Sequence, residues 1–311
     1  MSALPPPASG ERPAAVPAWS PLRAHLFVAL QHVLPQHQLS RVVHRLARVR
    51  SESVKNALIG AFVRHFRPEM TEAVESDPLR YDSFNAFFTR ALTARARPIA
   101  SEPGVVASPV DGTVSQIGYL TDRSILQAKG REYSLDALLG NRADWARLLA
   151  GGAFATLYLA PYNYHRIHMP RAATLRGAWY VPGRLFSVNA ATAGAVTNLF
   201  ARNERVVCAF GEDGPGRTPL SFAMVLVGAL FVGSIATVWH GDITPRNARR
   251  PCELPVEPGL NLERGAEMGR FNMGSTVILL FPRDTIEWLP HLAAGSRIRM
   301  GEPLAALRPS S

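Results

Sequence analysis

Cysteine and lysine are scarce in this 311-residue sequence. It has two cysteines, Cys208 and Cys252, and their spacing matches no metal-ligand motif, so neither a disulfide framework nor a cysteine-based zinc site is expected. A reducing compartment is the simplest setting for such a chain. Lysine is nearly absent, since Lys55 and Lys129 are the only two. The net charge of +10 therefore comes from arginine, and such a chain is attracted to anionic surfaces such as acidic lipid headgroups or nucleic acid.

Signals for membrane insertion are also weak. Residues 1–21 are rich in proline and alanine but lack the continuous apolar run of a signal peptide, so we expect a flexible tail. Residues 220–239 carry no charge and are long enough to cross a bilayer. However, Gly228 and Gly233 interrupt this segment, β-branched residues are frequent in it, and no strongly basic flank adjoins it. We therefore predict two consecutive buried strands there.

Helical patterns dominate the part of the chain before residue 98. Apolar residues recur every three or four positions in the first three segments, of which the first and third end near prolines, and Ser83 is a suitable N-cap for a fourth. The predicted helices cover residues 22–34, 39–49, 54–66 and 83–92. Arginines occupy the other face of the second helix. Two interpretations remain open: ordinary packing on a core, or an interfacial surface whose apolar side chains enter the membrane while arginines meet anionic headgroups.

After Pro98 the pattern changes to short β-rich runs separated by Gly, Pro, Asn and Asp. The predicted strands lie at residues 112–117, 153–159, 175–181, 205–210, 222–239 and 275–281. One helix is expected at residues 135–149. The fold class predicted is α+β, with a mainly antiparallel β core and N-terminal amphipathic helices. The expected organisation is a tail (1–21), a helical membrane-associating region (22–97) and a β-rich catalytic domain (98–311).

Three short motifs contain residues suited to catalysis. Asp111 begins a strand in "SPVDGTV", His165 and His168 stand three apart in "YNYHRIHMP", and Ser275 belongs to a Gly-Ser-Thr step. Asp-Gly is a common turn, and a Gly-Ser-Thr step can simply lead into a buried strand. A carboxylate, an imidazole and a serine can also form an activated nucleophile, although no Gly-x-Ser-x-Gly elbow is present. Zinc binding by the two histidines and Asp111 is a weaker alternative, since His-x-x-His by itself is a poor metal signal.

Several longer strings bear a specific resemblance to the bacterial phosphatidylserine decarboxylases, which are pyruvoyl-dependent lyases. The similarity runs from about Tyr81 to Phe281 and keeps the family's order along the chain. It rests on the strings "YDSFNAFFTRAL", "YHRIHMP", "GRLFSVNA", "NLFARNERV", "VGSIATVW" and "EMGRFNMGSTVILLF". One departure is Met273, where the family often has leucine or valine; a flexible apolar side chain of similar size should serve there.

The resemblance implies that the chain cuts itself between Gly274 and Ser275. The products would be a large β chain (1–274) and a small α chain (275–311) whose first residue becomes a covalent pyruvoyl group, with neither metal nor pyridoxal phosphate required. Glycine before the cut leaves its carbonyl open to attack. By the same resemblance, Ser275 is the nucleophile, His168 its base and Asp111 the group that orients His168.

The resemblance further implies that the mature enzyme decarboxylates phosphatidylserine to phosphatidylethanolamine. His165 is then the expected acid for the decarboxylation step. Four residues are weaker candidates for the substrate pocket: Tyr158, Tyr164, Ser187 and Asn189. For Ser187 and Asn189, a purely structural polar turn is nearly as good an explanation.

The expected partners are phosphatidylserine, an anionic membrane surface and the chain's own two products, in a homodimer of processed pairs. The expected location is peripheral, on the cytoplasmic face of the cytoplasmic membrane. A serine hydrolase using Ser275, His168 and Asp111 on lipid or acyl esters is the alternative enzyme. A basic binding scaffold is the non-enzymatic alternative. Nucleic acid is not an expected partner because the basic residues lack interleaved aromatic residues.

Overall fold

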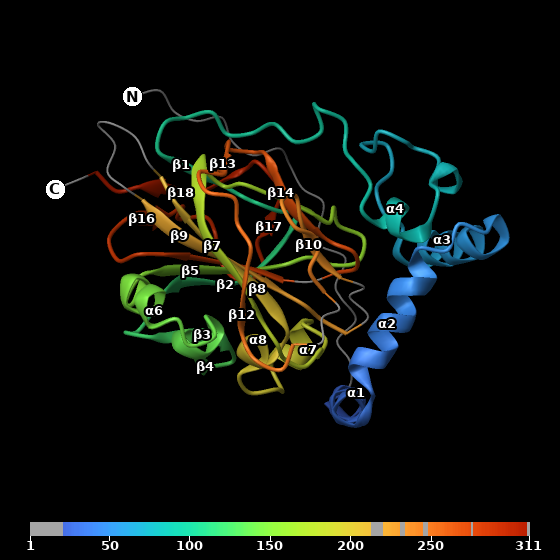
Figure 1. Ribbon diagram of the computed structural model, residues 1–311, viewed down its shortest axis with the longest axis horizontal. Helices are drawn as coiled ribbons and strands as arrows, with labels where there is room; N and C mark the ends of the chain where they lie inside the picture. Colours follow the sequence, from blue (N-terminus) through green and yellow to red (C-terminus); the bar gives the residue numbers. More distant parts are fainter. Residues whose placement is uncertain (1–20, 213–219, 231–233, 245–247, 275, 310–311) are drawn as a thin grey trace.

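The computed structural model describes residues 21–212, 220–230, 234–244, 248–274 and 276–309, with side chains from Leu26 onward. Helices come first in the chain, and most of the strands gather into one β-rich body beside them (Figure 1). Since the strand pairs within the sheets are antiparallel, the predicted α+β class with an antiparallel core is confirmed.

The four predicted N-terminal helices are present. They are α1 (Pro21–Val33), α2 (Gln36–Ala47), α3 (Glu52–Phe66) and α4 (Phe84–Phe88), with a short 3-10 turn η1 (Pro78–Arg80) before α4. The Oγ of Ser83 accepts a hydrogen bond from the Ala86 N–H at 3.1 Å, so Ser83 is the predicted N-cap. Helix α4 is shorter than expected because Thr89 leaves the helical conformation.

The prediction of one helix at residues 135–149 is wrong. Two short helices, α5 (Leu135–Leu138) and α6 (Ala143–Leu149), occupy this segment. Between them Gly140 and Asn141 both have positive φ, at 68° and 66°, and a right-handed helix cannot continue through two such residues. The remaining helices are α7 (Ala190–Ala193) and α8 (Leu199–Arg202).

A large antiparallel sheet forms the centre of the molecule. Its order is β12-β7-β8-β9-β15-β5-β2-β17, and β13 also pairs with β7. These strands are β2 (Gly112–Tyr119), β5 (Ala153–Tyr158), β7 (Ala173–Val181), β8 (Arg205–Gly211), β9 (Ser221–Val227), β12 (Cys252–Leu254), β13 (Asn261–Leu262), β15 (Thr276–Phe281) and β17 (Arg297–Ile298).

Three smaller sheets flank this one. Their orders are β11-β10-β14-β6, β1-β18-β16 and β3-β4. The strands are β1 (Val105–Ala107), β3 (Ser124–Ala128), β4 (Arg131–Ser134), β6 (Arg166–His168), β10 (Ile235–Thr237), β11 (Gly241–Asp242), β14 (Glu267–Phe271), β16 (Ile286–Trp288) and β18 (Pro303–Leu307).

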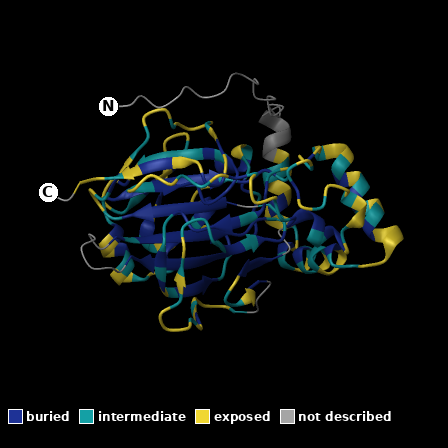
Figure 2. Ribbon diagram, turned by 90° about the horizontal axis from the view of Figure 1, so that it is seen from above, coloured by how far each residue is buried: buried dark blue, intermediate teal, exposed yellow. Residues whose placement is uncertain are grey.

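Strand β15, which follows the Gly-Ser step, lies inside the large sheet between β9 and β5. Its alternate side chains enter the two apolar cores on opposite faces of the sheet: Val277 and Leu279 belong to one, Ile278 and Leu280 to the other. Burial on both faces explains why the sequence there is continuously apolar. The central strands of the β body are coloured mostly as buried in Figure 2. Extensive pairing and two-sided burial fix this strand firmly in the fold.

The uncharged segment at residues 220–239 forms two strands, β9 and β10, in different sheets, as predicted. Within the described residues, no helix is both long and apolar enough to cross a bilayer.

The N-terminal helices pack against the β body through a third apolar cluster. It contains residues from α2, α3 and α4, and Met273 packs against it. Helix α1 and the start of α2 are tied down separately: the Gln31 and Gln36 side chains accept hydrogen bonds from the backbone N–H groups of Ser187 and Leu185. The helical region therefore contacts the residue immediately before Gly274, which links it to the candidate site.

Candidate active site

Strand register brings Asp111 and the Gly274 step to the same ends of neighbouring strands in the large sheet, a region here called the sheet edge. Thr276 pairs with Tyr158, which pairs with Thr113 on the other side. The starts of β15 and β2 therefore lie on either side of the end of β5, which Leu159 follows. A Cβ added to Gly112 would lie 2.3 Å from the Tyr158 carbonyl oxygen, so only glycine permits this approach after Asp111. Ser275 itself lies outside the described residues.

The segment after β5 carries Tyr164 and His165 to this edge, and β6, which follows, ends at His168. Its backbone is anchored on both sides of the site. The His168 N–H donates to the Pro109 carbonyl at 2.9 Å, two residues before Asp111, and the Phe271 N–H donates to the His165 carbonyl at 3.0 Å. The three motifs singled out in the sequence are thus brought together by strand pairing.

His165 lies directly beside Gly274. A Cβ built on Gly274 would be 3.5 Å from the His165 Nε2. The Nδ1 of this ring is 2.8 Å from the Asn163 carbonyl, so Nδ1 carries the hydrogen and Nε2 presents a lone pair. Among the described residues Nε2 has no hydrogen-bond partner. The Phe88 ring packs on the imidazole with centroids 4.1 Å apart.

Burial keeps the His165 imidazole neutral. The ring is fully buried, and this desolvation lowers its pKa to about 3, while the hydrogen bond to Asn163 opposes the shift and the charge of Arg90 adds to it. A neutral Nε2 beside Gly274, without a partner among the described residues, can accept a proton from a group arriving at Gly274.

Both ring nitrogens of His168 are occupied. Its Nδ1 is 2.8 Å from the Gly265 carbonyl, and its Nε2 is 2.9 Å from the Tyr164 hydroxyl. Burial raises the pKa of Tyr164 to about 12, so the phenol keeps its proton and donates it to Nε2. Burial also lowers the pKa of His168, an effect that the Gly265 hydrogen bond opposes. His168 is a neutral acceptor held by Tyr164.

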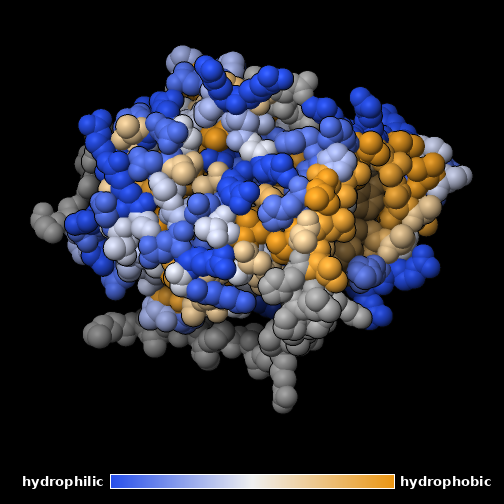
Figure 3. All heavy atoms as spheres, turned by 90° about the horizontal axis from the view of Figure 1, so that it is seen from below, coloured by the Kyte–Doolittle hydropathy of each residue, from blue (hydrophilic) through white to orange (hydrophobic). Residues whose placement is uncertain are grey.

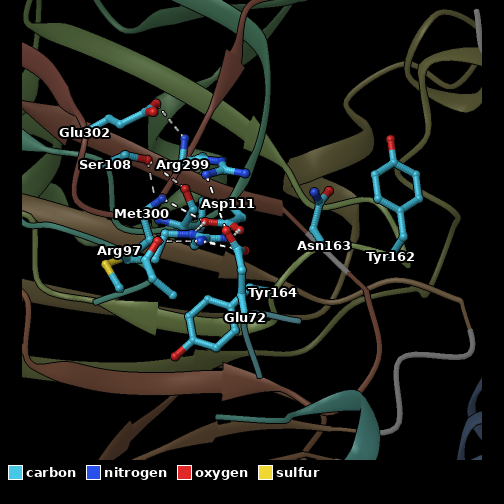
Figure 4. A network of polar contacts seen from close by, with 12 residues as sticks. Glu72, Arg97, Ser108, Asp111, Tyr162, Asn163, Tyr164, Arg299, Met300 and Glu302 are labelled. Carbon is cyan, nitrogen blue, oxygen red and sulfur yellow. Dashed lines mark hydrogen bonds and ion pairs between the residues drawn. The ribbon is translucent and has the colours of Figure 1, made fainter. Parts of the chain in front are cut away.

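Asp111 is held by a cation that the sequence analysis did not single out. The Arg97 guanidinium donates to it through Nε at 2.8 Å and Nη2 at 2.5 Å, and the Met300 N–H donates at 2.8 Å (Figure 4). Arg97 also pairs with Glu72 at 2.8 Å. None of these hydrogen bonds of the Asp111 carboxylate goes to His168. The negative charge of Asp111 nevertheless acts to raise the pKa of the His168 imidazole. Nothing in "RARPIA" indicates this pairing.

The remaining candidate residues have structural contacts. The Oδ1 of Asn189 accepts from the Thr192 N–H at 2.9 Å and so caps α7. The Ser187 backbone is bound to Gln31 of α1. Tyr158 pairs with Thr276 in the sheet, and burial raises its phenol pKa. A polar turn with a helix cap therefore accounts for the two residues of "FSVNA".

A polar network holds the strand end before Gly274. The Asn272 side chain donates to the Asp242 carboxylate at 3.1 Å and to the Ser234 hydroxyl, and its backbone N–H donates to the Ser234 carbonyl at 2.9 Å. Asp242 is also bound at 2.7 Å by Arg48, the residue that follows α2. The helical region therefore holds this strand end through Arg48 as well as through the apolar contacts of Met273.

A pH-dependent loss of stability should follow from the buried His165. The folded pKa of about 3 lies below the unfolded value of roughly 6.5, so between these values the unfolded chain binds the proton and the folded chain does not. Stability should therefore fall as pH falls through this window. We expect urea unfolding of the wild type to lose about 2 kcal/mol more than His165→Gln between pH 7 and pH 5. Equal losses in both proteins would mean that His165 titrates near its ordinary value.

A buried, neutral imidazole beside a glycine, with a second histidine and a held carboxylate at the same sheet edge, is typical of an enzyme active site. Within the described part of the chain, no group of three or more His, Cys, Asp or Glu residues could hold a metal ion.

Comparison with known proteins identifies the family of this enzyme. The family model described as phosphatidylserine decarboxylase matches residues 84–306, and a second one described as PSD matches residues 26–67. Proteins from Nitrosococcus oceani, Bordetella pertussis and Azotobacter vinelandii, each named phosphatidylserine decarboxylase proenzyme, are 53%, 49% and 49% identical to this chain. These alignments cover 92%, 92% and 91% of this chain and 92%, 95% and 98% of the relatives. The chain belongs to the phosphatidylserine decarboxylase family.

Proposed function

We propose that this protein decarboxylates phosphatidylserine to phosphatidylethanolamine, using a pyruvoyl group that it makes from its own Ser275. The observation that carries the proposal is the neutral, unpartnered Nε2 of His165, 3.5 Å from a Cβ position on Gly274. Family membership supports the decarboxylase and not the serine hydrolase alternative, and the word proenzyme in the relatives' names fits a self-processed chain.

Self-cleavage begins with Ser275 Oγ attacking the Gly274 carbonyl carbon, which converts the peptide bond into an ester. Loss of the Cα proton of residue 275 then breaks the Oγ–Cβ bond and releases the Gly274 carboxylate. Hydrolysis of the resulting dehydroalanine yields the pyruvoyl group and ammonia. We propose that His168 removes the serine proton and that the charge of Asp111 raises the basicity of this ring. Because the Tyr164 hydroxyl donates to His168 Nε2, the proton reaches this histidine through Tyr164 or after the phenol turns away.

The residues present fit a pyruvoyl group next to Gly274, since Gly274 brings no side chain and His165 Nε2 lies beside it without a partner among the described residues. Such a group supplies a carbonyl that reacts with the substrate amine and accepts the electrons released when carbon dioxide leaves. His165 Nε2 takes a proton from the substrate ammonium and returns it to the carbon that has lost its carboxylate. The proposed pocket for the headgroup includes Tyr158, Tyr164 and the Ser187–Asn189 turn.

The helical region is proposed to dock on the membrane surface. Exposed large apolar side chains gather on the side of the molecule formed by the N-terminal helices (Figure 3). They are Leu26, Leu30, Val33, Val42, Leu46 and Val54. Arginines on the same helices are suited to anionic headgroups, as expected for a helical region that lies in the interface. We propose peripheral attachment on the cytoplasmic face, with residues 22–97 as the docking region and residues 98–311 as the catalytic domain.

A charge placed on this apolar surface should weaken membrane binding. Leu30→Asp with Val33→Asp is expected to reduce binding to vesicles containing phosphatidylglycerol by at least about tenfold, because two side chains no longer enter the acyl boundary. Tyr119→Asp is the matched control, since Tyr119 in β2 is 51% exposed and Leu30 is 52% exposed. Co-sedimentation measures the bound fraction. Equal binding by the double variant and the control would mean that these helices pack on the protein and do not bind the membrane.

Processed chains are proposed to stay associated and to form a homodimer of processed pairs. Burial of β15 between β9 and β5 supports retention of the small chain, because its separation would expose both cores. Light scattering of the purified protein measures the mass of the assembly, and a mass of one processed pair would contradict the dimer.

Release of carbon dioxide tests the proposed reaction. Purified protein should liberate label from phosphatidylserine labelled in the serine carboxylate and leave phosphatidylethanolamine. A serine hydrolase would instead release fatty acid or serine and would react with a fluorophosphonate probe. Release of these products without carbon dioxide would overturn the proposal.

A further inference from the structure

Three described arginines are less than a tenth exposed, and they differ in what surrounds their charge. Arg97 has the carboxylates of Asp111 and Glu72. Arg205, 2% exposed, donates from Nε, Nη1 and Nη2 to four backbone carbonyls, those of Ala137, Leu138, Ala201 and Asn203. Arg90, 3% exposed, has one hydrogen bond, from Nη2 to the Tyr162 carbonyl at 3.2 Å, while its Nε and Nη1 have no partner among the described residues.

The Arg90 guanidinium donates to the carbonyl of Tyr162, in the segment that also carries Tyr164 and His165. It follows α4, whose Phe88 packs on the His165 ring and belongs to the cluster against which Met273 lies. The charge of Arg90 lowers the pKa of His165, and Asp111 acts on Arg90 in turn. No described carboxylate lies within ion-pair distance of it. A buried cation without a counter-ion is unfavourable, and an anion formed next to it would remove this cost.

Such an anion can form inside the protein. Arg90 Nε and Nη1 are inaccessible to solvent, so an ion from solution cannot reach them in the uncut chain. Self-cleavage as proposed above creates such an anion in place: elimination at residue 275 moves the electron pair of the Oγ–Cβ bond onto the ester oxygen, and Gly274 becomes a carboxylate. The Cα proton leaves to an imidazole of the site.

We propose that Arg90 is the preset counter-charge for the Gly274 carboxylate, and that it promotes the elimination step by stabilising this leaving group. The inference rests on the proposed self-cleavage. Arg90 acts on an oxyanion that exists only during and after processing, which explains why its donors are unpaired before it.

The sign of a stability change tests this role without any activity. In the uncleavable Ser275→Ala background, Arg90→Met should raise the melting temperature by about 2–4 °C, because it removes an uncompensated charge. Arg205→Met in the same background is the matched control. It should lower the melting temperature, because four carbonyls lose their donors. A decrease in both variants would make Arg90 a structural residue and overturn the proposal.

Processing kinetics test the step. Arg90→Met with Ser275 intact should form the two chains about 10- to 100-fold more slowly than the wild type, and Arg90→Lys should recover part of the rate. Hydroxylamine should restore cleavage of Arg90→Met by attacking the accumulated ester, giving a small chain that begins with an unmodified serine. Cleavage at the wild-type rate, even with a raised KM for phosphatidylserine, would overturn the proposal and move the role to the substrate. If the wild type itself stays uncut, the proposed function fails, while the melting comparison still reports on Arg90.

Discussion

Ser275→Ala is expected to remain a single chain of 311 residues without decarboxylase activity, whereas the wild type becomes two chains that meet at Gly274 and Ser275. The reason is chemical: without Oγ there is no ester, and without the ester neither cleavage nor a pyruvoyl group can follow. Activity should fall to background, because the variant lacks the group that accepts electrons from the substrate. Denaturing mass spectrometry gives the masses of the chains, and the small chain should lack a free amino terminus.

The neighbouring residue offers a matched control. Thr276 is fully buried, and its hydroxyl has no partner among the described residues, so Thr276→Val keeps the volume and removes only that hydroxyl. Thr276→Val should therefore be cleaved as in the wild type. An active wild-type protein that remains one intact chain would contradict the pyruvoyl proposal. If Thr276→Val is not cleaved, the Thr276 hydroxyl also takes part in the cleavage reaction.

The two histidines should separate cleavage from turnover. His168→Ala is expected to stay uncleaved, because it removes the proposed base for Ser275. His165→Ala should still form two chains, but its turnover per processed chain should fall about 10²- to 10⁴-fold, the usual contribution of a positioned acid–base group. Gel quantification of the chains and carbon dioxide release measure the two effects on the same samples.

The geometry makes this comparison informative. His165 Nε2 lies beside Gly274 and has no partner among the described residues, while His168 Nε2 is bound to Tyr164. If His165→Ala is uncleaved and His168→Ala is processed, the two roles are exchanged. His291→Ala, an exposed histidine after β16, is the control and should behave as the wild type in both measurements.

Local patterns were sufficient for the N-terminal helices and for the longest strands of the large sheet. Apolar spacing predicted the four N-terminal helices, and β-branched runs predicted β15 and the division of residues 220–239 into β9 and β10. The predicted helix at 135–149 was wrong because two successive residues with positive φ interrupt it, and only one of them is glycine. A left-handed asparagine is set by its surroundings, so the pattern of apolar residues did not indicate the break.

By itself the sequence determined the motifs that carry the chemistry and the family to which they belong, because these depend on residue types and short spacings. Tertiary structure alone decided which groups meet: Asp111 with Arg97 and Met300, His168 with Tyr164 and Gly265, and His165 with Phe88 and Gly274. Most of these partners are far apart in the chain. Their contacts follow from strand register and from packing of the N-terminal helices, which the local pattern of residues does not encode. Arg90 reads as an ordinary helix-end arginine in the sequence, and only its burial with unpaired donors distinguishes it.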